Sequence, residues 1–364
     1  MPTETPPGRL NELIAGYTSM NVSDVHAHPG QTLRISRYDR LYEDRSVPAP
    51  TAAEIETWIR AATGKTSDSL LAATGHACAP LETGTVRLRC TFRRGITGVS
   101  ASFRLIPAEI PTLDDLGVQD SIRNLIHARS GLVIIEGGTG HGKSTLNAAL
   151  LRGIRETYPK HIYIVEDPIE FIHPAEGNNS VIQREVGVHV SDYPSAVEDA
   201  LRSRPHVIMI GEMINAETAH AALRAATTGH LVFTTAHAGS ATEAVEGFIG
   251  QFPASEQPMI RTRLAQSLRA IIAQRLVPST DQKLVAAREV LINNLNFASL
   301  IRNADEHLIH GQLTSAPGCQ SLEDDLASLA FAGKITDAQG LAEAVNPAAY
   351  TANLKALRRM GAAA

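Results

Sequence analysis

Short apolar runs alternate with helical stretches through the middle of the chain. The runs lie at Leu132–Ile135, Ile162–Val165, Val207–Ile210 and Leu231–Thr234, and each is almost wholly apolar. Strands buried on both faces of a sheet have such continuous runs, and intervening helices place parallel strands side by side. The rhythm predicts βαβ units and a largely parallel sheet, in a core domain that we place at residues 118–297.

Residues 1–107 have a different pattern, in which apolar and polar positions alternate over 86–92. This alternation predicts a half-buried strand, and a second strand is expected over 99–106, after a turn at Gly95–Gly98. Ile55, Trp58 and Ile59 have helical spacing. We therefore expect a mixed α/β N-terminal domain over 1–107 and a proline-containing linker over 108–117. The alanine-rich residues 298–364 predict a helical C-terminal region.

Composition excludes several classes of protein. The chain has 364 residues, 43% hydrophobic and 20% charged, with a formal net charge of −5, which indicates a folded protein without a direct nucleic-acid partner. Cys78, Cys90 and Cys319 show no metal-ligand spacing, which favours reduced thiols in a cytoplasmic protein. Met1–Arg9 lacks the apolar core of a signal peptide, and no apolar run approaches the roughly 20 residues of a membrane span, so no membrane insertion is expected.

A phosphate-binding loop is predicted between the first apolar run and a helix over 144–157. Residues 137–144 match G-x-x-x-x-G-K-[ST] in full, although a bare match also arises by chance in glycine-rich turns. Backbone N–H groups of such a loop surround phosphates, the lysine reaches the β/γ-phosphates and the serine hydroxyl binds Mg²⁺. We expect ATP and Mg²⁺ as ligands. The nucleotide-binding residues are Gly137, Gly138, Thr139, Gly140, His141, Gly142, Lys143, Ser144 and Thr145.

Carboxylates follow the second and third apolar runs, at strand ends that face the same edge of a parallel sheet. Glu166, Asp167 and Glu170 follow the second run, and Glu212 follows the third. ATP hydrolysis needs a carboxylate near Mg²⁺ and one that polarises the attacking water. Gly211 stands where many P-loop proteins have the magnesium-linked aspartate, so Glu212 is expected to act on the water and to contact the metal through water. The alternative is that these acids are ordinary turn residues.

Two histidines bracket the last apolar run, His230 before it and His237 after it. One of them could contact the γ-phosphate; alternatively, one caps the strand and the other is solvated. The N-terminal domain carries several arginines on its expected strands, either on a solvated face or reaching phosphates across a subunit boundary. These are Arg87, Arg89, Arg93, Arg94 and Arg104.

The order of motifs resembles the secretion ATPase superfamily, which includes PilT-type pilus motors, type II secretion ATPases and the DotB and TraJ type IV secretion and conjugation ATPases. The resemblance runs over nearly the whole chain and rests on an S-D-[LIV]-H strand, an F-R-x-I-P segment, a Walker A loop, an Asp box, a Walker B strand and a His box. These correspond to residues 23–26, 103–107, 137–144, 165–171, 207–213 and 228–237.

The resemblance implies a PAS-like N-terminal domain joined to a RecA-like P-loop ATPase domain, in a homohexamer that works with inner-membrane components of a cell-envelope machine. It places the catalytic role on Glu212, with Glu166 and His237 also catalytic, and metal contacts on Ser144, Asp167 and Glu212. Arginines that reach the nucleotide map onto Arg89 and Arg104. Arg87 competes with Arg89 because the strand register is open.

The chain departs from the family pattern at several positions. His141 replaces the usual serine of the loop, Ile214-Asn215 replaces R-D after the Walker B motif, and Ala236–Ala238 replaces L-H-T. Arg204–His206 stands where pilus motors read D-P-D, which favours a DotB-like secretion or conjugation ATPase. A pilus retraction motor is the first alternative. A nucleotide-binding scaffold with little turnover and a P-loop small-molecule kinase are the others.

Overall fold

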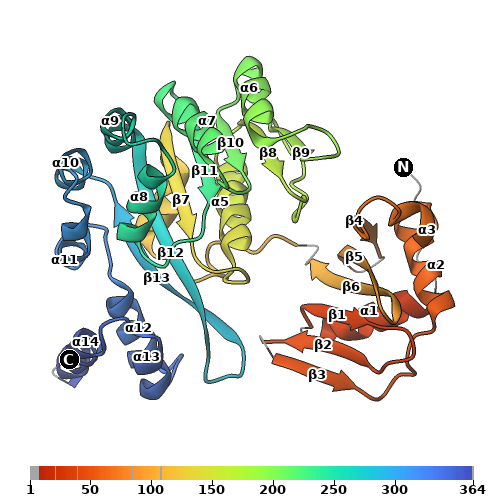
Figure 1. Ribbon diagram of the computed structural model, residues 1–364. Coiled ribbons are helices and arrows are strands. Elements are labelled where there is room, and N and C mark those ends of the chain that lie inside the picture. Colours follow the sequence, from red (N-terminus) through yellow and green to blue (C-terminus); the bar gives the residue numbers. More distant parts are fainter. Residues whose placement is uncertain (1–7, 21, 39, 84–85, 107–108, 363–364) are drawn as a thin grey trace. The chain divides into compact units, whose positions relative to one another are not determined.

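The computed structural model describes residues 8–20, 22–38, 40–83, 86–106 and 109–362, which form two compact units, Met1–Glu109 and Ile110–Ala364. Pro107 of the F-R-x-I-P segment, residue 108 of the expected linker and most of Met1–Arg9 lie outside the described residues. Each unit is described by itself below (Figure 1).

The first unit is built on an antiparallel six-stranded sheet in the order β3-β2-β1-β6-β5-β4. Its elements are α1 (Gly8–Ser19), β1 (Asp24–Ala27), β2 (Leu33–Arg37), β3 (Arg40–Asp44), α2 (Ala52–Thr63), α3 (Ser67–Leu70), β4 (His76–Glu82), β5 (Arg87–Gly95) and β6 (Gly98–Ile106). The two strands expected from alternation are β5 and β6, joined by the predicted turn.

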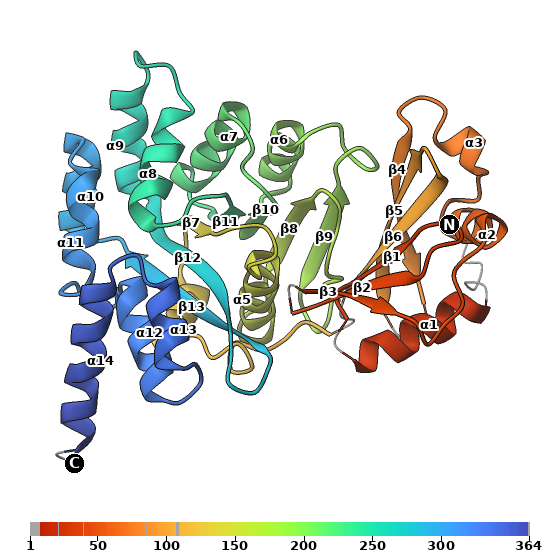
Figure 2. The same cartoon turned by 60° about the horizontal axis from the view of Figure 1, so that its bottom comes forward.

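One face of this sheet is covered by α1 and α2 (Figure 2). Helix α2 begins at a capping box, in which Thr51 and Glu54 each satisfy a backbone N–H of the other. Its apolar side buries Trp58 against Phe103 of β6, with ring centroids 5.5 Å apart in an edge-to-face arrangement. The opposite face of the sheet carries the polar positions of the alternating strands.

The second unit contains a seven-stranded sheet in the order β13-β12-β7-β11-β10-β8-β9. All neighbours are parallel except β12 and β13, which form an antiparallel pair at one edge. The strands are β7 (Gly131–Glu136), β8 (His161–Glu166), β9 (Ser180–Glu185), β10 (Val207–Ile210), β11 (Leu231–Thr235), β12 (Leu268–Pro278) and β13 (Leu284–Ile292).

Helices cover both faces of this sheet. One face is covered by α4 (Asp120–Arg123), η1 (Asn124–His127) and α5 (Lys143–Thr157). The other face is covered by α6 (Tyr193–Ser203), α7 (Ala216–Thr227), α8 (Ala241–Gly250), α9 (Gln257–Ser267), α10 (Leu295–Asn303) and α11 (Ile309–Leu313), with η2 at Glu306–Leu308. Neighbouring strand residues therefore point into different cores, which explains why the predicted strands are apolar at consecutive positions.

The C-terminal helices form a separate small core with the ends of β12 and β13 (Figures 1 and 2). They are α12 (Leu322–Phe331), α13 (Asp337–Glu343) and α14 (Pro347–Ala362). Val277 and Ala287 contribute the sheet side of this core, and Leu326 and Tyr350 contribute the helical side.

The four apolar runs form β7, β8, β10 and β11, which are neighbours in the middle of the sheet. The sequence interpretation did not mark β9, β12 or β13. Residues 110–117, expected in the linker, pack on the second unit: Ile110 and Leu113 are buried, and Arg152 donates a hydrogen bond to the Ile110 carbonyl. Apolar side chains at two positions thus fasten this segment to the sheet domain despite its proline.

Candidate active site

The phosphate loop joins the end of β7 to the first turn of α5. Gly137, Gly140 and Gly142 adopt positive φ angles of 142°, 82° and 76°, a region that favours glycine. A Cβ at Gly137 would also lie 2.4 Å from the Gln274 carbonyl oxygen. The loop conformation therefore requires these glycines, and the N-terminus of α5 adds unpaired N–H groups suited to a phosphate.

Lys143, the first residue of α5, is 9% exposed and folds back over the loop. Its Nζ donates to the carbonyls of Gly137 at 2.5 Å and Gly138 at 3.1 Å, and lies 3.3 Å from Nδ1 of His237. Burial lowers the pKa of Lys143, against the nearby carboxylates of Glu212, Glu136 and Glu170. The ammonium group is thus held at the loop by weak, replaceable partners.

His237 links the phosphate loop to the end of β10. Its Nε2 lies 2.7 Å from Oε1 of Glu212. Since the Lys143 ammonium can only donate, Nδ1 must accept, and the ring proton then sits on Nε2 and is donated to Glu212. The three side chains therefore form one chain of hydrogen bonds, assembled from residues that the motifs had indicated separately.

Glu136, the last residue of β7, is a buried carboxylate that the sequence interpretation overlooked. It is 1% exposed, and its Oε2 accepts the N–H of Ala238 at 2.8 Å. Burial raises its pKa, while that N–H and the charges of Lys143 and His237 act in the opposite direction. Glu136 therefore holds the loop that carries His237. An acid at a strand end was the available signal, the same one that pointed to Glu166.

The turn after β10 is tightly enclosed, which explains why Gly211 precedes Glu212. A Cβ at Gly211 would lie 3.1 Å from both the Glu166 Cα and the Tyr193 hydroxyl oxygen. Glu166 is buried at the end of β8, and Asp167 is exposed beside it. Burial, and then the charges of Asp167, Glu212 and Glu166, raise the pKa of Tyr193. Tyr193 thus marks the point where the two acidic strand ends meet, and no sequence motif had singled it out.

The remaining loop residues lie as follows. Gly138, Thr139 and Gly140 form the exposed crest, and Ser144 and Thr145 are half-buried in the first turn of α5. The His141 ring lies against Gly138, where a Cβ would be 3.4 Å from its Cδ2 and Nε2. Its Nδ1 is buried without a hydrogen-bond partner in the described part of the chain.

The two histidines around β11 lie at opposite ends of that strand. His230 precedes it, and its Nδ1 lies 3.2 Å from the Ala225 carbonyl oxygen and 3.3 Å from the Thr228 hydroxyl. His237 follows the carboxyl end, beside Glu212. The geometry therefore brings only His237 into the loop's surroundings.

The candidate arginines belong to the first unit. Arg89 and Arg104 are direct cross-strand partners in the β5–β6 pair. Arg104 is exposed and forms an ion pair with Asp24 at 2.8 Å, and Arg87 pairs with Glu82 at 3.3 Å. A contact of Arg89 or Arg104 with nucleotide stays a prediction.

No cluster of three or more His, Cys, Asp or Glu side chains in the described part of the chain could hold a metal by itself. Mg²⁺ at nucleotide sites takes few protein ligands and keeps phosphate oxygens and waters. The hydroxyl of Ser144 and the carboxylate oxygens of Glu212 and Asp167 are donors of the type that Mg²⁺ prefers, and their contact with a Mg²⁺ that arrives with nucleotide stays a prediction.

Among the helices in the described ranges, none combines the length and apolarity needed to cross a membrane.

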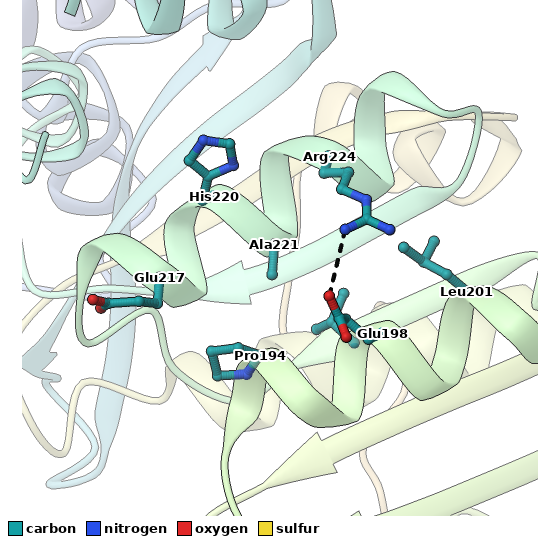
Figure 3. A pocket seen from close by; sticks show the side chains of 8 residues that line it. Pro194, Glu198, Leu201, Glu217, His220, Ala221 and Arg224 are labelled. Atoms are coloured by element: carbon teal, nitrogen blue, oxygen red, sulfur yellow. Dashed lines mark ion pairs between the residues drawn. The ribbon is translucent and has the colours of Figure 1, made fainter. Parts of the chain in front are cut away.

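A small pocket lies between α6 and α7 (Figure 3). Arg224 and Glu198 form an ion pair of 3.5 Å there, and Pro194, Leu201 and His220 are among the other lining residues. None of its lining residues is among the expected nucleotide or catalytic residues, so this pocket is separate from the phosphate loop.

Comparison with known proteins identifies the family. The sequence profile described as "Type II/IV secretion system protein" matches residues 11–335. The chain belongs to this family. A twitching motility protein of Neisseria gonorrhoeae is 39% identical over 65% of this chain, but the match spans only 64% of the gonococcal protein, less than two thirds. The type IV pilus retraction ATPase PilT of Pseudomonas aeruginosa is 36% identical over 70% of this chain and 74% of its own length.

Solved structures of family members share the fold. The pilus retraction motor PilT with bound ADP superposes with a TM-score of 0.83 at 31% identity, covering 96% of this chain and 99% of that one. The ATPase DotB of Legionella pneumophila gives 0.79 at 26% identity, covering 93% and 96%. The expected fold class, a PAS-like mixed α/β domain and a RecA-like ATPase domain with a helical C-terminal region, is confirmed. The expected superfamily is confirmed as well.

Proposed function

We propose that this chain hydrolyses ATP at the loop of residues 137–144 to drive a cell-envelope machine of the type II/IV secretion class. The observation that carries the proposal is the hydrogen-bonded chain from Lys143 through His237 to Glu212. It connects the group that binds phosphate with the carboxylate that acts on water. Relatives whose names contain ATPase, and a related motor with bound ADP, support it.

The residues suggest how the site works. An incoming phosphate group offers Lys143 a charged partner in place of two neutral carbonyls and the His237 ring. His237 Nδ1 then loses its donor, while Nε2–H still orients the Glu212 carboxylate. Glu212 accepts a proton from the attacking water while the water oxygen bonds to the γ-phosphorus and the bond from that phosphorus to the ADP oxygen breaks, which releases ADP and phosphate. A Mg²⁺ bound with the nucleotide and held by Ser144, Asp167 and Glu212 would neutralise phosphate charge.

The working form in this proposal is a homohexamer on the cytoplasmic side of the inner membrane, bound there through membrane components of the machine. Arg89 and Arg104 would reach nucleotide from the N-terminal domain, as in the family. The proposal requires a native mass near six chains in the presence of ATP. A monomer under all conditions would leave these arginines without a role in trans.

The catalytic part of the proposal is tested by nucleotide binding and steady-state ATPase assays. Lys143→Ala should abolish ATP binding, because it removes the ammonium group that lies at the loop and donates to the Gly137 and Gly138 carbonyls. Glu212→Gln should keep ATP binding and lower kcat by about 10²–10⁴, the usual contribution of a general base. Wild-type protein that binds ATP with Mg²⁺ but does not turn it over would favour the nucleotide-binding scaffold instead.

Two machines fit the family, and different observations favour each. Relatives named for twitching motility and pilus retraction, at 39% and 36% identity, favour a retraction motor. The segment Arg204–His206 favours a DotB-like secretion or conjugation ATPase. It lies before the amino end of β10, however, whereas Glu212 follows the carboxyl end, so it says nothing about the nucleotide chemistry. Loss of twitching on deletion would support retraction, and loss of DNA or effector transfer would support secretion.

A further inference from the structure

A line of buried polar contacts joins the phosphate loop to the segment by which the chain enters the second unit. Its centre is the pair Gln274 on β12 and Arg288 on β13, which are directly opposite each other in the antiparallel register. Each is 3% exposed. Neither residue belongs to a motif that the sequence interpretation used.

Gln274 contacts the loop directly. Its Nε2 donates to the His141 carbonyl at 2.7 Å, and its Oε1 accepts from Nε of Arg288 at 2.8 Å. A guanidinium only donates, so Arg288 selects the amide oxygen and leaves the amide N–H₂ for the loop. The fit is close, because a Cβ at Gly142 would lie 3.0 Å from Nε2 of Gln274.

Arg288 reaches in the other direction to the entry segment, residues 110–119. Its Nη2 donates to the Leu116 carbonyl at 2.9 Å, and its Nη1 to the Gly117 carbonyl at 3.4 Å. The backbone N–H of Arg288 donates to Asp325 at 2.8 Å, and Asp325 also accepts from Gln119 at 3.4 Å. Arg288 therefore bonds the loop's support and the entry segment at the same time.

The interior position of Arg288 argues that these bonds have a use beyond filling space. Burial lowers the pKa of its guanidinium, and Asp325 opposes this. The guanidinium itself donates to neutral oxygens, of one amide and two carbonyls. An apolar side chain of similar volume would avoid the desolvation of a charge. What such a side chain could not do is orient Gln274 and hold residues 116 and 117.

We propose that Gln274 and Arg288 are positioning residues that couple the entry segment to the phosphate loop. Displacement of residues 116–117 changes the orientation of the Gln274 amide and so the order of the loop at His141. Conversely, nucleotide in the loop stabilises the entry segment. We call this coupling through Arg288 and Gln274 the relay, and it rests on the proposed nucleotide function. Through the relay, a change in the segment that connects the two units alters the loop that binds the phosphates.

The test uses the full-length chain with ADP as the probe, comparing wild type, Gln274→Met, Arg288→Met and the double variant. Gln274→Met should weaken ADP binding about three- to ten-fold, the effect of losing one neutral hydrogen bond in a preorganised loop. If Arg288 acts through Gln274, the double variant binds ADP no more weakly than whichever single variant has the lower affinity for ADP. Losses that multiply would overturn the relay.

Hydrogen–deuterium exchange distinguishes coupling through Gln274 and Arg288 from a purely structural role of these residues, because a structural role would not make exchange in residues 110–119 depend on ADP. ADP should slow amide exchange in residues 110–119 of the wild type and leave it unchanged in Gln274→Met, a variant that keeps Arg288. Arg155→Met is the matched control, because Arg155 is a buried arginine that donates to the Pro174 carbonyl. It should lower the unfolding temperature without affecting ADP binding or the exchange response.

The outcomes separate the relay from the proposed function. Wild type that does not bind ADP would overturn both. The relay alone would be overturned if the wild type binds ADP but ADP does not slow exchange in residues 110–119. It would also be overturned if Arg155→Met loses as much ADP affinity as Gln274→Met. If Arg288→Met does not fold, Arg288→Lys replaces it. The comparison of ADP-dependent exchange in wild type and Gln274→Met then still tests the relay.

Discussion

Replacement of His237 by alanine tests the hydrogen-bonded chain at the site. The variant loses the donor to Glu212 at 2.7 Å and the neighbour of Lys143 at 3.3 Å. A hydrogen bond to a charged group contributes about 1.5–3 kcal/mol when buried. The two side chains are 47% and 40% exposed, so solvent reduces this to about 1 kcal/mol. If that energy orients the carboxylate in the transition state, kcat falls about five-fold.

The affinity for ATP should change by less than about two-fold, because His237 competes with phosphate for Lys143 rather than assisting it. Glutamine and asparagine distinguish the two contacts of the ring. His237→Gln places an amide near Nε2 and should restore much of kcat, whereas His237→Asn places one near Nδ1 and should not. His230→Ala, at the other end of β11, is the control.

The assay is steady-state ATP hydrolysis together with equilibrium binding of ATP. A role of the His237–Glu212 contact in kcat is refuted if asparagine restores kcat and glutamine does not. It is equally refuted if His230→Ala lowers kcat as much as His237→Ala, because the loss would then reflect the strand and not the Glu212 contact.

Further predictions concern stability. Burial raises the pKa of Glu136 above 4.5, so the native state binds more protons and stability falls as pH rises from 4.5 toward that pKa. Glu136→Gln should flatten this decline in urea unfolding, and an unchanged slope would contradict it. Burial lowers the pKa of His173 from 6.5 to about 4, so its contribution, about 3 kcal/mol, is lost as pH falls between those values. His173→Leu should remove that loss; persistence of the full acid destabilisation would count against it. Gly211→Ala should cost about 1–3 kcal/mol through its close approach to the Tyr193 hydroxyl and to the backbone of Glu166, and less in a Tyr193→Phe background; equal melting-temperature losses in the two backgrounds would exclude the Tyr193 hydroxyl as a source of the clash.

The sequence predicted strands correctly where the apolar pattern of a short segment is enough to determine its secondary structure. Strands β7, β8, β10 and β11 are apolar at consecutive positions because both faces of the sheet are covered. Strand β9 was missed because it is a partly exposed edge strand, with the pattern S-V-I-Q-R-E. Strands β12 and β13 were missed because polar residues interrupt them, although Gln274, Arg288 and Glu289 are buried.

The family, and the positions of the loop of residues 137–144 and of Glu212 at strand ends, follow from the sequence alone, because a glycine-rich turn, a lysine and a strand-end acid are local features with a recognisable order. Their roles in binding and hydrolysis stay predictions. Tertiary structure decided which side chains share the site. It brought His237 between Lys143 and Glu212, and it separated His230 from them. It also buried Glu136, Gln274 and Arg288 beside the loop. A buried polar side chain is stable only where folding supplies its partners, and those partners come from distant strands that no local pattern places together.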